Sequence, residues 1–289
     1  MNATRKLAVG LGGAVLLACG GPPEREALEP LATSAQGLAS LCTADSWSVS
    51  CPSSSTSLYA AGLWRSVYYQ TPAGTPPSGG WPVVVFYQGS FNPAWTAFSG
   101  TQADPFGRYS LALTTKTLLD NGYAVVAPNA LLNGTTYWQT NIAPYATNWS
   151  ISADHPFVLA VLSGISGGRF GPLNAGRKYA MGISSGGFMT SRMAVSYGGQ
   201  FKALAVQSGS YAWCSSACVV PVPLPSNHPP TLFLHGLLDT VVPIGSMTVY
   251  RDELNREGRS TRTVVNPNAG HEWLPEGPQE VLGWFNGHP

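Results

Sequence analysis

Runs of consecutive apolar residues recur along the chain, between segments of helical periodicity. The clearest runs are residues 81–87 and 123–128, which are rich in β-branched and aromatic side chains and lack polar alternation. Such continuous runs are typical of strands that are buried on both faces of a sheet. Shorter runs that predict further strands lie at residues 63–69, 179–181, 201–206, 230–236 and 261–265.

Segments with apolar residues at helical spacing separate these predicted strands. Residues 105–122, 154–165 and 279–286 predict helices, as does the segment that follows position 184. Strands that alternate with helices favour a parallel sheet covered by helices on both faces, which is an α/β fold. The connection at residues 129–152 has no clear period, and long loops of this kind often line functional sites.

The first forty residues differ from the rest of the chain. Residues 1–18 combine a basic start with about a dozen apolar residues, which is typical of an export signal and too short for a stable membrane span. Residues 19–40, rich in Pro, Glu and Ala, predict a flexible tether. Residues 41–289 are long enough for one large α/β catalytic domain with a full core.

The end of the signal segment resembles the cleavage motif of bacterial lipoproteins. The sequence Leu-Leu-Ala-Cys ends at Cys19, and the resemblance implies cleavage before Cys19 and acylation of its thiol. Gly20 at the next position favours an outer-membrane destination. A plain secretory signal is the alternative, and it would also export the protein. We therefore expect an exported protein whose only membrane contact is a lipid anchor.

Composition narrows the class of protein further. The formal net charge is +1 and only 10% of residues are charged, so nothing indicates a nucleic-acid groove or a polybasic membrane surface. Hydrophobic residues reach 44% despite 33 Gly and 24 Pro, which is typical of a loop-rich globular protein. No phosphate-binding loop, dinucleotide fingerprint or metal-ligand spacing is found in the sequence, so we expect no cofactor and no metal.

Four cysteines besides Cys19 form two close pairs. Cys42 and Cys51 are one pair, and Cys214 and Cys218 are the other. Export to an oxidising compartment favours two disulfides, and local pairing is the simplest of the three connectivities.

A G-x-S-x-G pentapeptide spans Gly182 to Gly186, between a predicted strand and a predicted helix. This context is the one that a nucleophile elbow requires. The two glycines lack a Cβ, so strand and helix can approach closely around a strained Ser184. The N-terminus of the helix presents free N–H groups to a developing oxyanion.

A serine hydroxyl needs a histidine base, and that base needs a carboxylate to orient it. The chain offers Ser184, Asp239 and His271 in that order, each just past a predicted strand. His235 is the main rival base, although its position at a strand end better suits a structural role. The other nearby acids, which are expected to be solvated or to point away, are Asp252, Glu253 and Glu272.

The segments GISSGGFMT, FKALAVQSG, HGLLDTVVP and AGHEW resemble the polyhydroxybutyrate-depolymerase/feruloyl-esterase branch of the α/β-hydrolase superfamily. The resemblance runs from about residue 81 to the C-terminus. It implies exported serine esterases that act on polyesters or on acylated polysaccharides. It assigns Ser184 as nucleophile, Asp239 as acid and His271 as base. The N–H groups of Ser185 and Ser90 would form the oxyanion hole, with the Gly89 N–H as an alternative donor in the second loop.

Two departures accompany the resemblance. Gln88 stands where the family usually has His before the oxyanion loop, and we expect no polymer-binding domain after the catalytic domain. An alternative enzyme is a serine peptidase of the prolyl-oligopeptidase type, and a non-catalytic surface-binding lipoprotein is a third possibility. We expect the substrate to be an ester, either polymeric or small. The candidate wall residues of its cleft are Trp138, Trp149, Trp213 and Trp273. Packing within a surface loop is the alternative for Trp138 and Trp149.

Overall fold

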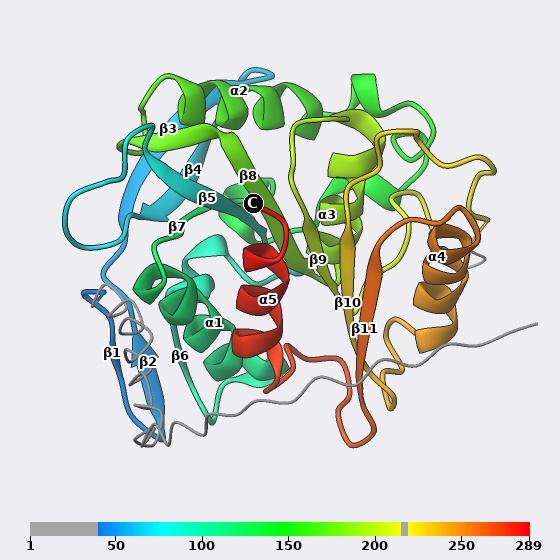
Figure 1. The fold of residues 1–289 in the computed structure, drawn as a ribbon. Helices are drawn as coiled ribbons and strands as arrows, with labels where there is room; N and C mark the ends of the chain where they lie inside the picture. Colours follow the sequence, from blue (N-terminus) through cyan, green and yellow to red (C-terminus); the bar gives the residue numbers. More distant parts are fainter. Residues whose placement is uncertain (1–39, 215–218) are drawn as a thin grey trace, which may run out of the picture. The chain divides into compact units, whose positions relative to one another are not determined.

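An eight-stranded sheet forms the centre of the computed structural model, which describes residues 40–214 and 219–289. Its strands are β3 (Ser54–Ala60), β4 (Leu63–Gln70), β5 (Trp81–Tyr87), β7 (Ala124–Pro128), β8 (Leu173–Ile183), β9 (Leu204–Gln207), β10 (Thr231–Gly236) and β11 (Thr261–Asn266). They follow in the order β11-β10-β9-β8-β5-β7-β4-β3 (Figure 1). Neighbours from β11 to β7 are parallel, whereas β4 and β3 add an antiparallel hairpin at one edge.

Helices cover both faces of this sheet. On one face lie α1 (Arg108–Asp120) and α5 (Gly277–Asn286), which run side by side in Figure 1. On the other face lie α2 (Asp154–Ser166), α3 (Ser185–Ser196) and α4 (Ile244–Arg256). Short 3₁₀ turns complete the connections: η1 (Ala94–Ala97), η2 (Pro105–Gly107), η3 (Leu132–Gly134), η4 (Gln139–Asn141) and η5 (Trp149–Ile151).

The alternating faces of β5 explain why its sequence is continuously apolar. Val84 and Phe86 pack against the layer of α1 and α5, while Val83 and Val85 pack against the layer of α2 and α3. Every residue of this strand is buried. A strand with helices on both faces has no solvated side on which a polar residue could point, so the period-two pattern disappears.

A small antiparallel sheet lies beside α1. It consists of β1 (Thr43–Ala44), β2 (Ser48–Ser50) and β6 (Ser99–Thr101), in the order β1-β2-β6. The Cys42–Cys51 disulfide closes the β1–β2 hairpin, as expected from the spacing of the two cysteines.

The α/β architecture predicted from the hydrophobic pattern is confirmed. The pattern missed β1, β2 and β6, which have only two or three residues each, and β3, whose seven residues are mostly exposed or half-buried and polar. The predicted helix at residues 105–122 begins later, at Arg108, since Phe106 and Gly107 have positive φ angles. The signal segment, Cys19, the tether up to residue 39, and Cys218 lie outside the described residues. Cys214 is in a disulfide.

Candidate active site

Ser184 lies in the sharp turn between β8 and α3. Its backbone has φ 58° and ψ −125°, a strained conformation for a residue with a side chain. The Ser184 N–H donates to the Gln207 carbonyl at 3.1 Å, which ties the turn to β9. A Cβ on Gly186 would overlap the carbonyl oxygen of Tyr87, and a Cβ on Gly182 would overlap that of Gly186. The two glycines therefore allow β5, β8 and α3 to converge beneath the serine.

Asp239 and His271 follow β10 and β11 and meet at the same edge of the sheet. His271 Nδ1 lies 2.8 Å from Asp239 Oδ2. Asp239 Oδ1 accepts hydrogen bonds from the N–H groups of Val241 at 2.9 Å and Val242 at 2.8 Å. This carboxylate is buried, so these contacts fix both of its oxygens. Because Nδ1 faces a carboxylate, Nε2 is the ring nitrogen of His271 that could accept a proton.

The electrostatics of Asp239 keep it ionised. Burial alone would raise the pKa of the Asp239 carboxyl, but hydrogen bonds from His271 and from the Val242 N–H outweigh burial and lower the pKa below its ordinary value. An ionised carboxylate next to His271 stabilises the imidazolium that forms when a histidine accepts a proton.

His235, the rival base, is completely buried and has another partner. Its Nε2 lies 2.8 Å from the Val242 carbonyl oxygen, and it approaches Asp239 Oδ2 only to 3.6 Å. Burial lowers the pKa of His235. A neutral imidazole that donates to a backbone carbonyl supports the loop around Asp239, which is a structural role.

Two backbone N–H groups next to Ser184 have no acceptor among the described residues. Ser185 is the first residue of α3, so its N–H has no partner within the helix. In the loop after β5, Phe91 donates to the Thr136 carbonyl at 3.0 Å and Asn92 to the Gly89 carbonyl at 3.3 Å, whereas no acceptor is found in the described part of the chain for the N–H of Ser90. A Cβ added to Gly89 would lie in van der Waals contact with the Ser184 side chain, so the loop passes close to the serine. This arrangement suits an oxyanion hole.

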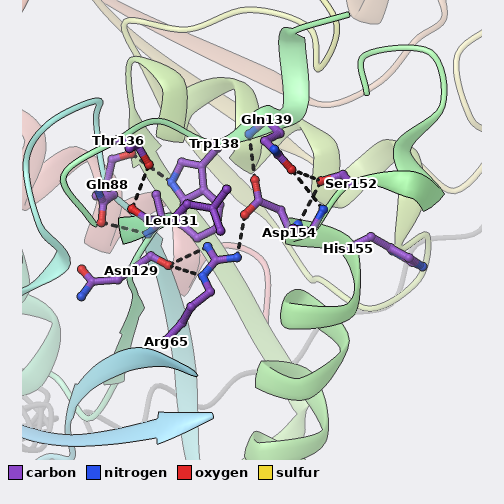
Figure 2. Close-up of polar contacts among 12 residues, drawn as sticks. Arg65, Gln88, Asn129, Leu131, Thr136, Trp138, Gln139, Ser152, Asp154 and His155 are labelled. Carbon is purple, nitrogen blue, oxygen red and sulfur yellow. Dashed lines mark hydrogen bonds and ion pairs between the residues drawn. The ribbon is translucent and has the colours of Figure 1, made fainter. Parts of the chain in front are cut away.

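Gln88 holds the loop that carries Ser90 (Figure 2). Its side chain donates from Nε2 to the Gly134 carbonyl at 2.6 Å and accepts from the Ala130 N–H at 3.1 Å. Its own carbonyl accepts from Trp138 Nε1 at 3.2 Å. Gln88 is fully buried. The residue that departs from the family pattern is therefore the one that fastens this loop to the segment after β7.

A buried ion pair supports the same segment from β4 (Figure 2). Arg65 Nη1 lies 2.7 Å from Asp154 Oδ1, at the start of α2, and both side chains are almost inaccessible to water. Arg65 also donates to the Asn129 carbonyl from Nε at 3.1 Å and from Nη2 at 2.7 Å. Asp154 Oδ2 accepts from the Gln139 N–H at 2.7 Å. The pair thus joins β4, the loop after β7 and α2.

An apolar cavity of about 290 Å³ opens beside Ser184 and His271. Its walls are mostly aromatic and aliphatic, with Arg108 as the charged side chain among them. Phe91 and Phe106 form an exposed part of the wall, and Leu111 lies deeper. The lining also includes Phe86, Gly89, Ser90, Asn92, Thr96, Pro105, Ile183 and Val241.

The predicted tryptophan wall is not what lines this cavity. Trp138 and Trp273 are completely buried, and Trp149 is 7% exposed. Trp138 packs edge-on against Tyr87, while Trp213 donates to the Val219 carbonyl at 3.1 Å. These tryptophans are core and loop-packing residues. Phe91 and Phe106, which form the wall instead, both have positive φ angles, a feature that the sequence does not reveal.

Within residues 40–214 and 219–289, no cluster of three or more His, Cys, Asp or Glu side chains could hold a metal ion. Over the same residues, no helix combines the length and the apolar character needed to cross a bilayer.

The chain is similar to known hydrolases in sequence and in fold. The chain is 55% identical over 226 residues to a poly(3-hydroxyoctanoate) depolymerase of Pseudomonas fluorescens, which corresponds to 78% of this chain and 80% of that protein. Residues 217–286 match the Prolyl oligopeptidase family.

Solved structures with low sequence identity show the fold alone. Esterase PE8 is similar with a TM-score of 0.55 and 20% identity, covering 76% of this chain and 99% of that chain. An acylaminoacyl peptidase of Pyrococcus horikoshii is similar with a TM-score of 0.57 and 17% identity, covering 84% of this chain and 42% of that chain.

Fold and relatives together define a serine hydrolase of the α/β-hydrolase superfamily, and more narrowly a carboxylic ester hydrolase. The chain belongs to the polyhydroxyalkanoate-depolymerase family that the Pseudomonas enzyme represents.

Proposed function

We propose that the protein is an exported depolymerase that hydrolyses the backbone esters of a polyester of 3-hydroxy fatty acids. Ser184 is the nucleophile, His271 the base and Asp239 the acid of its triad. The observation that carries the proposal is the 2.8 Å contact between His271 and Asp239, at an apolar cavity that Ser184 also lines. The strained Ser184 backbone, typical of a nucleophile elbow, supports it further.

The reaction runs through an acyl-enzyme. His271 accepts the proton of Ser184 as Oγ attacks the ester carbonyl carbon, and the N–H groups of Ser90 and Ser185 stabilise the oxyanion. The intermediate collapses, the C–O bond to the alcohol breaks, and His271 returns the proton to the leaving oxygen. Water then attacks the acyl-enzyme with His271 again as base, which releases the acid and restores Ser184.

The cavity supports an apolar acyl or side-chain group in the substrate. Its aliphatic and aromatic walls would bury a medium-length alkyl chain, whereas a sugar would leave hydroxyl groups without partners. The relative acts, by its name, on poly(3-hydroxyoctanoate). Both observations favour a hydrophobic polyester over an acylated polysaccharide.

Labelling with a fluorophosphonate, followed by intact-mass analysis, tests the nucleophile. We expect one adduct on the wild-type enzyme and none on Ser184→Ala. Hydrolysis of p-nitrophenyl esters should be greatest for medium-length acyl chains, and films of poly(3-hydroxyoctanoate) should be degraded. Esterase activity of Ser184→Ala comparable to that of the wild type would refute the assignment. A preference for feruloyl or acetyl esters would refute the polyester substrate.

The match to the Prolyl oligopeptidase family gives a second candidate, a serine peptidase. Comparing peptide p-nitroanilides with p-nitrophenyl esters separates the two activities. Higher kcat/KM on the amides would favour the peptidase. The high identity to a depolymerase leads us to expect the opposite.

Export and anchoring are part of the same proposal. Residues 1–18 direct export and Cys19 accepts the lipid, so metabolic labelling with a radioactive fatty acid should mark the wild type and not Cys19→Ser. Label retained in the variant would refute lipidation at this residue.

A further inference from the structure

Exposed apolar side chains gather beside the site at the tip of the β3–β4 hairpin. Strand β4 runs antiparallel to β7, with Val67 opposite Pro128 at the carboxyl end of β7. Leu63 and Trp64 therefore extend past that end, toward the edge of the sheet where Ser184 lies. Trp64 is 68% exposed, and its ring contacts that of Tyr59 across the hairpin.

The loop after β7 brings further apolar side chains to the same place. Leu132 is 74% exposed and Tyr137 is 43% exposed. Together with Leu63 and Trp64 they line a groove of about 420 Å³, which we call the hairpin groove. The remaining lining residues are Arg65, Leu131, Asn133, Thr136 and Gln139.

The hairpin groove shares a lining residue with a cavity at the candidate active site. Tyr137 lines the groove, and it also lines a neighbouring cavity of about 590 Å³ that includes Ser90, Ser184 and Ser185. An extended chain bound at Ser184 could therefore continue past Tyr137 toward Trp64. The cavity with the phenylalanine wall lies at the same serine and would hold a side chain at the cleavage point.

The chemistry of the groove selects an uncharged, apolar occupant. Arg65 is its charged lining residue, and that guanidinium points into the protein, where it pairs with Asp154 (Figure 2). No ionic group is thus presented to a ligand by the described lining. Exposed Trp, Tyr and Leu side chains gain free energy when apolar surface covers them, and contiguous patches of this type mark binding sites.

We infer that the hairpin groove binds the units of the polyester chain next to the one being cleaved. The inference rests on the proposed function, and it adds the surface that distinguishes a polymer from a small ester. A p-nitrophenyl ester occupies the region around Ser184, whereas an oligomer with enough units reaches Trp64 and Leu132. Longer oligomers should therefore have a higher kcat/KM than short ones.

The experiment measures kcat/KM for oligomers of 3-hydroxyoctanoate of increasing length, dispersed in detergent, and for p-nitrophenyl octanoate. The variants are Trp64→Ser and Leu132→Ser. The matched control is Leu159→Ser, an exposed leucine on α2 away from the groove. We expect the ratio of kcat/KM for the long oligomers to kcat/KM for p-nitrophenyl octanoate to fall about tenfold in the two groove variants. The control should keep the wild-type ratio.

Several outcomes would overturn the inference. They are a wild-type ratio in both groove variants, an equal fall in Leu159→Ser, or a wild-type kcat/KM that does not rise with oligomer length. Failure of the proposed function gives a different result, because the wild type would then leave the oligomers of every length unhydrolysed, whether or not it hydrolyses the p-nitrophenyl ester.

Discussion

Replacing Arg65 by methionine removes the cationic half of the buried ion pair while keeping much of the side-chain volume. The Asp154 carboxylate, which is inaccessible to water, would keep the hydrogen bond from the Gln139 N–H but lose the Arg65 guanidinium, which lies 2.7 Å from Oδ1. The Asn129 carbonyl would lose two donors, and the rings of Phe157 and Trp138 would lose a guanidinium at 3.8 and 5.3 Å from their centroids.

The expected loss in the free energy of unfolding follows from leaving the buried Asp154 charge without its partner. Breaking such a pair from one side typically destabilises a protein by about 3–5 kcal/mol. For a domain of this size each kcal/mol corresponds to roughly 2–4 °C, so the melting temperature should fall by roughly 6–20 °C. The matched control is Arg251→Met at the exposed pair with Asp252, where the loss should be about 0–1 kcal/mol.

Urea denaturation at several pH values measures the free energy of unfolding of both variants and tests whether the buried Asp154 charge causes the loss. Burial raises the pKa of Asp154 in the folded protein, although Arg65 opposes this shift. Without Arg65 the folded pKa rises further above the unfolded value, so the variant regains stability as the pH falls and Asp154 takes up a proton. The difference in the free energy of unfolding between wild type and Arg65→Met should therefore become smaller toward acid pH. A loss below about 1 kcal/mol at neutral pH would refute the reasoning, as would a difference that does not depend on pH.

Three further predictions concern the site and its support. Asp239→Asn should lower kcat on the order of 10⁴-fold with the fold intact, because the amide cannot stabilise the His271 imidazolium. Ester kinetics measure kcat, and circular dichroism checks that the variant is folded. A near-wild-type kcat would contradict the triad. Gln88→Leu loses the hydrogen bonds to the Gly134 carbonyl at 2.6 Å and from the Ala130 N–H at 3.1 Å. It should therefore displace Ser90 and lower kcat up to about 10²-fold with little change in KM. A change in KM alone would contradict an oxyanion role for the Ser90 N–H. Burial lowers the pKa of His228 to about 4 from 6.5, so the unfolded chain takes up the proton first. The free energy of unfolding is then highest above pH 6.5 and should fall by about 3 kcal/mol toward pH 4, a slope that His228→Gln should reduce in urea titrations.

The strand–turn–helix around Ser184 and the order of the candidate triad along the chain could be predicted from the sequence, because both depend on local patterns. Gly182 and Gly186 bracket Ser184 between an apolar strand and a periodic helix, and Asp239 and His271 each follow a strand. In a parallel sheet the carboxyl ends of all strands lie at one edge, so residues just past them meet without further information.

Which side chains form the walls was decided by tertiary structure alone. Trp138 is covered by Arg65 from β4 and by Tyr87 from β5, segments that lie far from it in the chain. The sequence shows Gln88 only as a departure from the family pattern, because its partners Gly134 and Ala130 come from beyond β7. Burial depends on which distant segments pack together, and an amphipathic side chain such as tryptophan fits a core as well as a cleft.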